Sequence, residues 1–189
     1  MEFLWTYRNL VAGLPLVFAV VSQRWEWDKD SVLWPIAIVL CVVGIAVRSW
    51  AACYCRYGQG EKKTLAVTGP YALVRNPLYW GNILVLAGAI VASELAWLLL
   101  VAMPWAFLVY DSAVRVEEHR LAQKYGEEFE RYKLAVGRWF PRRWPRGSGA
   151  PIVPRGSLLR TAVGQFPNIF VLLPFLAKEI NIFDLWPPG

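Results

Sequence analysis

Apolar residues gather in four long stretches of the chain, and this pattern predicts helices that span a membrane. Each stretch is close to the ~20 residues with which a helix crosses the ~30 Å of hydrocarbon in a bilayer. The predicted spans are about 4–22, 32–54, 77–93 and 95–113. Only Ser93 and Glu94 separate the third stretch from the fourth, which predicts a tight helical hairpin. The pattern therefore favours an all-α integral membrane protein.

The remaining segments are more polar and belong to the same single domain, residues 1–189. The segment 114–141 is predicted to be helical and to lie outside the membrane, and 142–160, rich in Pro, Gly and Arg, is predicted to be a linker. A fifth and weaker apolar stretch, 161–180, is interrupted by two prolines. Its pattern leaves open whether it spans the membrane, re-enters it or lies in the interface. The expected architecture is a bundle of four to five transmembrane helices with one polar helical segment.

Composition supports a membrane location. Of the 189 residues, 57% are hydrophobic and 18% are charged, and the mean hydropathy is +0.36. This is less charge than a soluble domain usually carries. The eleven Trp suit membrane–water interfaces, where the ring is apolar and its N–H stays hydrated. A structural zinc site needs four ligands, and the chain has no second Cys pair besides Cys53 and Cys55 and only one His, so no metal is expected.

The distribution of Lys and Arg predicts the orientation. The loop 23–31 holds one Arg and one Lys, whereas 56–76 and 114–160 are richer in basic residues. Because positive segments stay cytoplasmic, we expect these two segments and the N-terminus to share the cytoplasmic face of a bacterial inner membrane. The net charge of +6 then reflects topology and contact with membrane lipids. No nucleic-acid motif is present, so no nucleic-acid partner is expected.

A first polar block lies at the mouth of the third span, where residues 69–81 read GPYALVRNPLYWG. Polar groups such as Arg75, Asn76 and Tyr79 are costly in lipid and by default mark a lined cavity. The alternative interpretation is local. Gly-Pro and Asn-Pro are ordinary punctuation of loops and helix starts, and Arg75 and Tyr79 could be interface anchors.

A second block follows the fourth span. The helix of that span is expected to continue to Lys124 and to stop at Gly126. In the short helix predicted next, Phe129, Tyr132 and Val136 recur at helical spacing and would form one apolar face.

On the longer helix of this block, charged residues also recur at helical spacing. Asp111, Arg115 and either Glu118 or His119 share one face. Taken alone, this pattern is typical of a solvated, salt-bridged helix surface.

Together the two blocks resemble the signature of the isoprenylcysteine carboxyl methyltransferase family. The first is similar to its Gly-Pro-Tyr…Arg-(His/Asn)-Pro-x-Tyr-x-Gly pattern, with Asn76 in place of the commoner His, as in bacterial relatives. The second is similar to Arg-x-Glu-Glu-x-x-Leu…Tyr-Gly-x-x-(Phe/Tyr)-x-x-Tyr…Arg-x-x-Pro. Members are integral membrane enzymes that use S-adenosylmethionine. The resemblance covers roughly 62–141 and implies methyl transfer to a lipophilic or lipidated substrate resident in the membrane.

The resemblance also implies a cofactor site on the cytoplasmic face, capped by the segment 114–141. The residues that it assigns to the cofactor are Lys63, Thr64, Leu65, Ala66, Tyr71, Asn76, Pro77, Leu78, Tyr79, Glu117 and Glu118. One carboxylate of the Glu pair would meet the ammonium or ribose of the cofactor, and which one stays open. Arg115 would act in catalysis by holding a substrate carboxylate, with Arg48 and Arg75 as alternatives.

The chemistry is consistent with these residue types. Methyl transfer from a sulfonium needs alignment more than acid–base catalysis. A carboxylate acceptor is already ionised at neutral pH, so it needs a cation to hold it and no general base. An amine acceptor would have to lose a proton, which a Glu or a water could take.

Two other functions stay open. One is an NADPH-dependent membrane reductase, because 124–126 resembles a Lys-Tyr-Gly pattern of sterol reductases. The other is a non-enzymatic membrane protein that retains the fold. The oligomeric state is not predicted.

Overall fold

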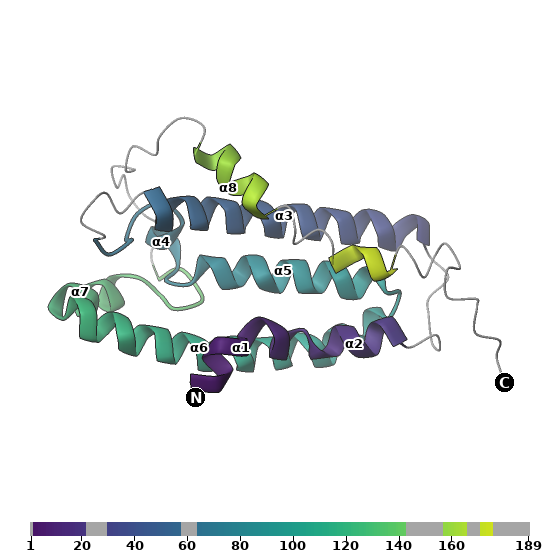
Figure 1. The fold of residues 1–189 in the computed structure, drawn as a ribbon, viewed down its shortest axis with the longest axis horizontal. Coiled ribbons are helices and arrows are strands. Elements are labelled where there is room, and N and C mark those ends of the chain that lie inside the picture. The colour runs from purple at the N-terminus through teal and green to yellow at the C-terminus, as the bar shows by residue number, and fades with distance from the viewer. Residues whose placement is uncertain (1, 22–29, 58–63, 143–156, 166–170, 176–189) are drawn as a thin grey trace.

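The computed structural model describes residues 2–21, 30–57, 64–142, 157–165 and 171–175, and helices dominate this part of the chain (Figure 1). The elements are α1 (Glu2–Ala12), α2 (Leu14–Val21), α3 (Asp30–Tyr57), α4 (Pro70–Leu73), α5 (Pro77–Ala92), the 3-10 helix η1 (Ala96–Leu98), α6 (Leu99–Tyr125), α7 (Glu127–Ala135) and α8 (Ser157–Gln165). Within the described residues, the one β-type pairing is an isolated bridge between Val74 and Gly137. The all-α class predicted from the sequence is confirmed.

All four apolar stretches are helical. The helices at 31–56 and 96–125 are each long and apolar enough to cross a membrane, whereas those at 5–21 and 77–92 are apolar but shorter. The tight turn between the third and fourth stretches is present, with Glu94 at a φ of 62°. That all four helices cross a membrane stays a prediction.

The first apolar stretch is broken into two helices at Gly13. The Gly13 N–H donates to the Asn9 carbonyl at 3.0 Å, and α2 begins one residue later. Pro15 therefore falls in the first turn of α2, where its missing N–H would have had no partner in any case.

The predicted fifth stretch is described only in part, as the end of α8 and residues 171–175. The nine residues of α8 are too few to cross a bilayer alone. Most of the predicted linker, 143–156, lies outside the described residues, as do 166–170 and 176–180.

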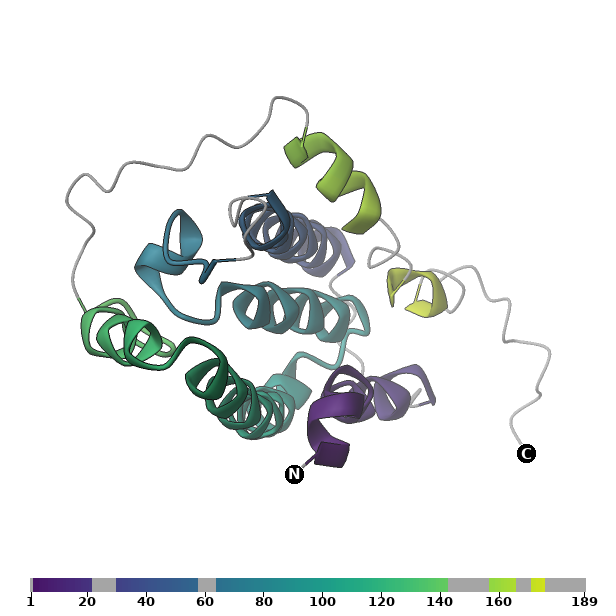
Figure 2. The ribbon, with the colours of Figure 1, turned by 60° about the vertical axis from the view of Figure 1, so that its left-hand side comes forward.

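Helix α5 lies between α3 and α6, α1 packs along α6, and α2 contacts α5 (Figure 2). Small residues allow α3 and α5 to approach closely, as is usual between membrane helices. A Cβ added at Gly81 would come within 2.4 Å of the Arg48 Cγ and 2.7 Å of the Gly44 carbonyl oxygen. A Cβ at Gly88 would come within 2.6 Å of the Cys41 Sγ. The backbones, rather than interlocking large side chains, therefore set the spacing of this helix pair.

Large apolar side chains cover the outer faces of the two longest helices. Exposed examples on α3 and α6 are Ile38, Val39, Val42, Val43, Leu100, Val101 and Leu108. On a soluble monomer, an exposed apolar surface of this extent would promote aggregation, whereas in a membrane lipid covers it. The faces of these helices thus support association with a membrane.

The polar segments gather at one end of the bundle, where α4, the start of α5, the end of α6 and α7 lie together (Figure 1). Helix α6 continues beyond the predicted span and ends at Gly126, whose φ is 53°. In α7 and just after it, Phe129, Tyr132 and Val136 are buried in one cluster with Leu65. The predicted helix stop and the predicted apolar face are both confirmed.

Candidate functional site

The two sequence blocks meet at this end of the bundle through their backbones. The Arg75 N–H donates to the Gly137 carbonyl at 2.9 Å, beside the Val74–Gly137 bridge. The Tyr132 hydroxyl donates to the Tyr71 carbonyl at 2.7 Å. Segments about 60 residues apart in the chain are therefore fixed against each other (74 and 137 differ by 63).

The carboxylate of Glu118 lies between two arginines. Arg75 donates from Nε and Nη2 to Glu118 Oε1 at 2.9 and 2.8 Å. Arg138 donates from Nη2 to Oε2 at 2.6 Å and from Nε to Oε1 at 3.2 Å. Arg75 also donates to the carbonyls of Lys133 and Val136, at the end of α7. Glu118 is thus the centre of a network that joins α6, α7 and the turn before α5.

This environment determines the ionisation of Glu118, which lies beyond the predicted end of the fourth span. Burial alone would raise its pKa, but the hydrogen bonds from Arg138 and Arg75 outweigh burial and hold the pKa below its usual range. The carboxylate therefore stays charged through neutral pH.

Asp111, about two helical turns before Glu118 on α6, extends the same network. Its Oδ1 accepts from the Trp139 indole N–H at 2.9 Å and from Arg138 Nη1 at 3.4 Å. Its Oδ2 accepts from Arg115 Nε at 2.8 Å. The Arg115 side chain is 64% exposed, so it lies at the edge of this network. The shared face that the spacing predicted for Asp111, Arg115 and Glu118 is present.

Glu117 does not contact the arginines that bind Glu118 and instead pairs with Tyr79. Its Oε2 accepts from the Tyr79 hydroxyl at 3.0 Å, and its Oε1 accepts no hydrogen bond from the described residues. The Tyr71 phenol also neighbours Glu117, and burial together with Cys55 and Glu117 raises the Tyr71 pKa well above its usual value. Glu117 is therefore a half-buried carboxylate with acceptor capacity to spare.

Arg8 of α1 lies beside Tyr79, and the sequence analysis did not predict that it belongs to the site. Its guanidinium carbon lies 5.8 Å from the centre of the Tyr79 ring and 5.2 Å from that of Trp5. It is the only charged residue inside the first apolar stretch, and this was the signal that could have found it.

The other residues assigned to the cofactor differ in their placement. Asn76 is buried and donates from Nδ2 to the Arg138 carbonyl at 3.2 Å. Pro77 begins α5, Leu78 is half-buried beside it, and Leu65 is buried against α7. Thr64 is exposed and Ala66 is half-buried. Lys63 lies outside the described residues.

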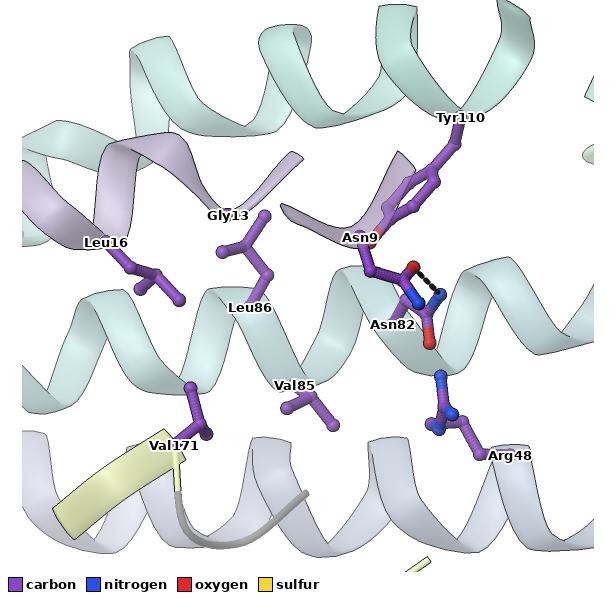
Figure 3. A pocket seen from close by; sticks show the side chains of 9 residues that line it. All are labelled: Asn9, Gly13, Leu16, Arg48, Asn82, Val85, Leu86, Tyr110 and Val171. Carbon is purple, nitrogen blue, oxygen red and sulfur yellow. Dashed lines mark hydrogen bonds between the residues drawn. The ribbon is translucent and has the colours of Figure 1, made fainter. Parts of the chain in front are cut away.

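A cavity of about 310 Å³ lies among α1, α2, α3, α5 and α6 (Figure 3). Its polar lining consists of Asn9, Arg48, Asn82 and Tyr110. The Tyr110 and Tyr79 rings are 5.1 Å apart, so the cavity adjoins the Tyr79–Glu117 pair.

Comparison with known proteins places the chain in a family. The family model described as phospholipid methyltransferase matches residues 35–128, which include the first block and the Glu pair. The chain is 31% identical over 147 residues to the cobalt-zinc-cadmium resistance protein CzcN of Cupriavidus metallidurans, covering 75% of this chain and 67% of that protein. It is 27% identical over 178 residues to the nickel-cobalt-cadmium resistance protein NccN of Alcaligenes xylosoxydans xylosoxydans, covering 92% of this chain and 82% of that protein. No solved structure matches the chain significantly. By the family match and the relative at 31% identity, the chain belongs to the phospholipid methyltransferase family, which includes proteins of the isoprenylcysteine carboxyl methyltransferase type.

Proposed function

We propose that this protein transfers a methyl group from S-adenosylmethionine to a lipophilic acceptor in the membrane, with the cofactor site on the cytoplasmic face. The observation that carries the proposal is the Tyr79–Glu117 pair, which joins the two sequence blocks where the bundle meets its polar end. A polar cofactor and a lipophilic acceptor can meet only at such a boundary.

The residues at this boundary suit S-adenosylmethionine. Bound there, the cofactor supplies an activated methyl group on a sulfonium sulfur. Glu117 offers a carboxylate with a free acceptor oxygen for an ammonium or ribose hydroxyl, and Arg8 offers a guanidinium for a carboxylate. The Tyr79 hydroxyl donates to this carboxylate, and the buried Tyr71 phenol neighbours it.

The two residues of the Glu pair take different roles in this proposal. Glu118 is surrounded by Arg75 and Arg138, so its oxygens are already engaged within the protein. We assign cofactor binding to Glu117 and assign to Glu118 the task of holding α7 and the start of α5 in place. Asn76 supports the same scaffold through the Arg138 carbonyl.

Binding of S-adenosylmethionine to detergent-solubilised protein tests the proposal. We expect micromolar-scale affinity, which corresponds to about 8 kcal/mol. Glu117→Gln removes a charge-assisted contact worth about 1.5–3 kcal/mol, so it should weaken binding roughly ten- to a hundredfold. Glu128→Gln, which changes an exposed carboxylate on α7, is the matched control and should not alter affinity.

The same experiment separates the alternatives. Folded protein that binds no S-adenosylmethionine at millimolar concentration would contradict the proposal. Binding of NADPH instead would support a reductase, and binding of neither would support a non-enzymatic membrane protein.

The names of the two relatives favour a second candidate function, a contribution to tolerance of metals such as cobalt and cadmium. Among the described residues no group of three or more His, Cys, Asp and Glu could hold a metal ion. We therefore propose that any such contribution depends on methyl transfer. A host strain lacking the protein should regain tolerance with the wild type and not with Glu117→Gln. Equal rescue by both would separate metal tolerance from the methyltransferase site.

A further inference from the structure

Helix α8 packs against α3 with its polar side turned inward. Ser157, Thr161 and Gln165 recur every four residues, so they share one face of the helix. Ser157 and Thr161 are buried, and the Ser157 Oγ lies 3.3 Å from the Cys53 Sγ of α3. At the other end of α8, the Gln165 Oε1 accepts from Arg48 Nε at 3.1 Å. The polar stripe of α8 therefore faces α3 rather than its surroundings.

The outward face of α8 is mostly apolar, with Leu158, Leu159 and Val163 exposed. A helix on the surface of a soluble protein has the opposite arrangement, with its apolar side chains inward and its polar ones in water. Small hydroxyl-bearing residues at the helix contact are usual where lipid surrounds the helices. Arg160 is also exposed, but it lies in the first turn of α8, from which its long side chain can reach the lipid headgroups. The polarity of α8 thus suits a surrounding of acyl chains.

The contacts of α8 place it beside the predicted second span and not beyond the end of that span. Its first residue lies beside Cys53 and its last beside Arg48, and both of these residues fall within 32–54. Helix α8 therefore runs antiparallel to α3, from the polar end toward the middle of the bundle (Figure 1). A helix that lay flat in the membrane interface would cross α3 instead of following it.

Residues 171–175 lie further along the same side of the bundle, at its opposite end (Figure 1). Phe175 is buried in the main core, and with Val171 it lines a cavity of about 290 Å³ beside Val21, the last residue of α2. The ring of Phe18, also on α2, is 6.2 Å from that of Trp97 in η1, which joins α5 to α6. This part of α2 therefore marks the end of the bundle opposite to the polar one. The two described pieces together extend from one end of the bundle to the other.

We propose that α8 and residues 171–175 are two pieces of a fifth membrane crossing that follows α3, and that lipid acyl chains cover the outward face of α8. Trp50 of α3, which lies between the two contacts with α8, is also exposed, so the apolar outer surface extends from α3 onto α8. Gln165 binds Arg48, and Val171 lines the same cavity as Arg48, so the crossing forms one wall of that cavity. The inference does not depend on methyl transfer.

Oxidative cross-linking tests the position of α8 in the membrane-embedded protein. Ser157→Cys changes one side-chain atom and places a thiol beside the native Cys53, within reach of a disulfide. Every variant also carries Cys55→Ser, which removes the exposed native thiol. After oxidation and denaturation, Ser157→Cys should retain only the Cys41 thiol for modification by a maleimide. Leu158→Cys, the outward-facing neighbour, is the matched control and should keep all its thiols free. Equal cross-linking of both variants, or of neither, would overturn the packing of α8 on α3.

Reactivity of the outward face identifies what covers it. Leu159 on α8 and Leu134 on α7 are 70% and 77% exposed, so the protein itself shields them about equally. In open membrane fragments, a water-soluble maleimide should modify Leu134→Cys roughly tenfold faster than Leu159→Cys, because a thiol in hydrocarbon does not form the reactive thiolate. Leu173→Cys, at an exposed position in the second piece, should react as slowly as Leu159→Cys. After denaturation in detergent, all three variants should react alike.

The other possible surroundings of α8 give different results. Modification of Leu159→Cys as fast as Leu134→Cys would place α8 in water and overturn the crossing. Slow modification together with a dimer cross-linked through Leu159→Cys by a bismaleimide would show that a second copy covers this face, which would overturn the assignment to lipid. In bilayers of brominated phosphatidylcholine, a bimane on Val163→Cys should be quenched more by bromine in the middle of the acyl chain than by bromine near the headgroup. The reverse order would place α8 in the interface and overturn the crossing.

Discussion

Glu118→Gln should destabilise the protein because it removes the charge at the centre of the network between the two sequence blocks. The side chains of Arg75 and Glu118 are only 8% and 10% exposed, so solvent cannot replace the lost partner. Removing one member of a buried ion pair costs about 3–5 kcal/mol. Arg138 is 31% exposed, and Arg75 keeps two carbonyl acceptors, so we expect the lower end, about 3 kcal/mol.

Thermal unfolding in detergent is the suitable assay. For a chain of this size, 1 kcal/mol corresponds to about 2–4 °C in Tm, so Glu118→Gln should lower Tm by about 6–12 °C. Glu128→Gln removes an exposed carboxylate from α7 and should change stability by less than about 0.5 kcal/mol. If the two variants unfold within about 2 °C of each other, the network does not hold the blocks together as described.

The pH dependence gives an independent check. Because the pKa of Glu118 is lowered in the folded protein, its stabilisation is fully present above the usual Glu pKa of about 4.3 and is lost as pH falls through the folded pKa. The difference in Tm between wild type and Glu118→Gln should thus be constant from pH 6 to 8 and shrink in acid. A difference that widens as pH falls from 5 to 3 would contradict the assignment.

Three further substitutions test the packing and the topology. Gly81→Ala should destabilise the α3–α5 pair by about 1–3 kcal/mol, since its Cβ would meet the Arg48 stem at 2.4 Å; thermal unfolding checks this, and an unchanged Tm would contradict the close approach. Tyr132→Phe leaves the buried Tyr71 carbonyl without its donor and should cost about 1–3 kcal/mol in the same assay, whereas no loss would imply a replacement donor. A cysteine at Asp28 should react with an impermeant thiol reagent added outside intact cells; protection there would reverse the predicted topology.

Much of the helical framework could be predicted because its signals are local. The apolar stretches mark the helices, and the glycine at 126 marks the end of α6, since each of these depends on residues close together in the chain. The break at Gly13 was missed because a single glycine within an apolar run has no unambiguous local signature. That break matters, since both Gly13 and Asn9 line the cavity with Arg48.

The site could be predicted only as a set of residues and not as an arrangement of them. The resemblance brought Arg75, Asn76 and the Glu pair to one region, but the contact of Arg75 with Glu118 joins residues 43 positions apart. Such a contact depends on how α5 and α6 are rotated against each other, which no local pattern encodes. For the same reason the sequence assigned the acceptor to Arg115 and left Arg48 and Arg75 as alternatives.

The register of α6 explains how adjacent glutamates acquire separate tasks. Consecutive residues of an α-helix point about 100° apart, whereas residues seven apart return to nearly the same face. Asp111 and Glu118 form one such pair, and both bind Arg138. Tyr110 and Glu117 form the other, and both contact Tyr79. One face of α6 therefore holds the scaffold and the neighbouring face lines the proposed site, so a substitution at 117 should alter ligand binding and the same substitution at 118 should alter stability.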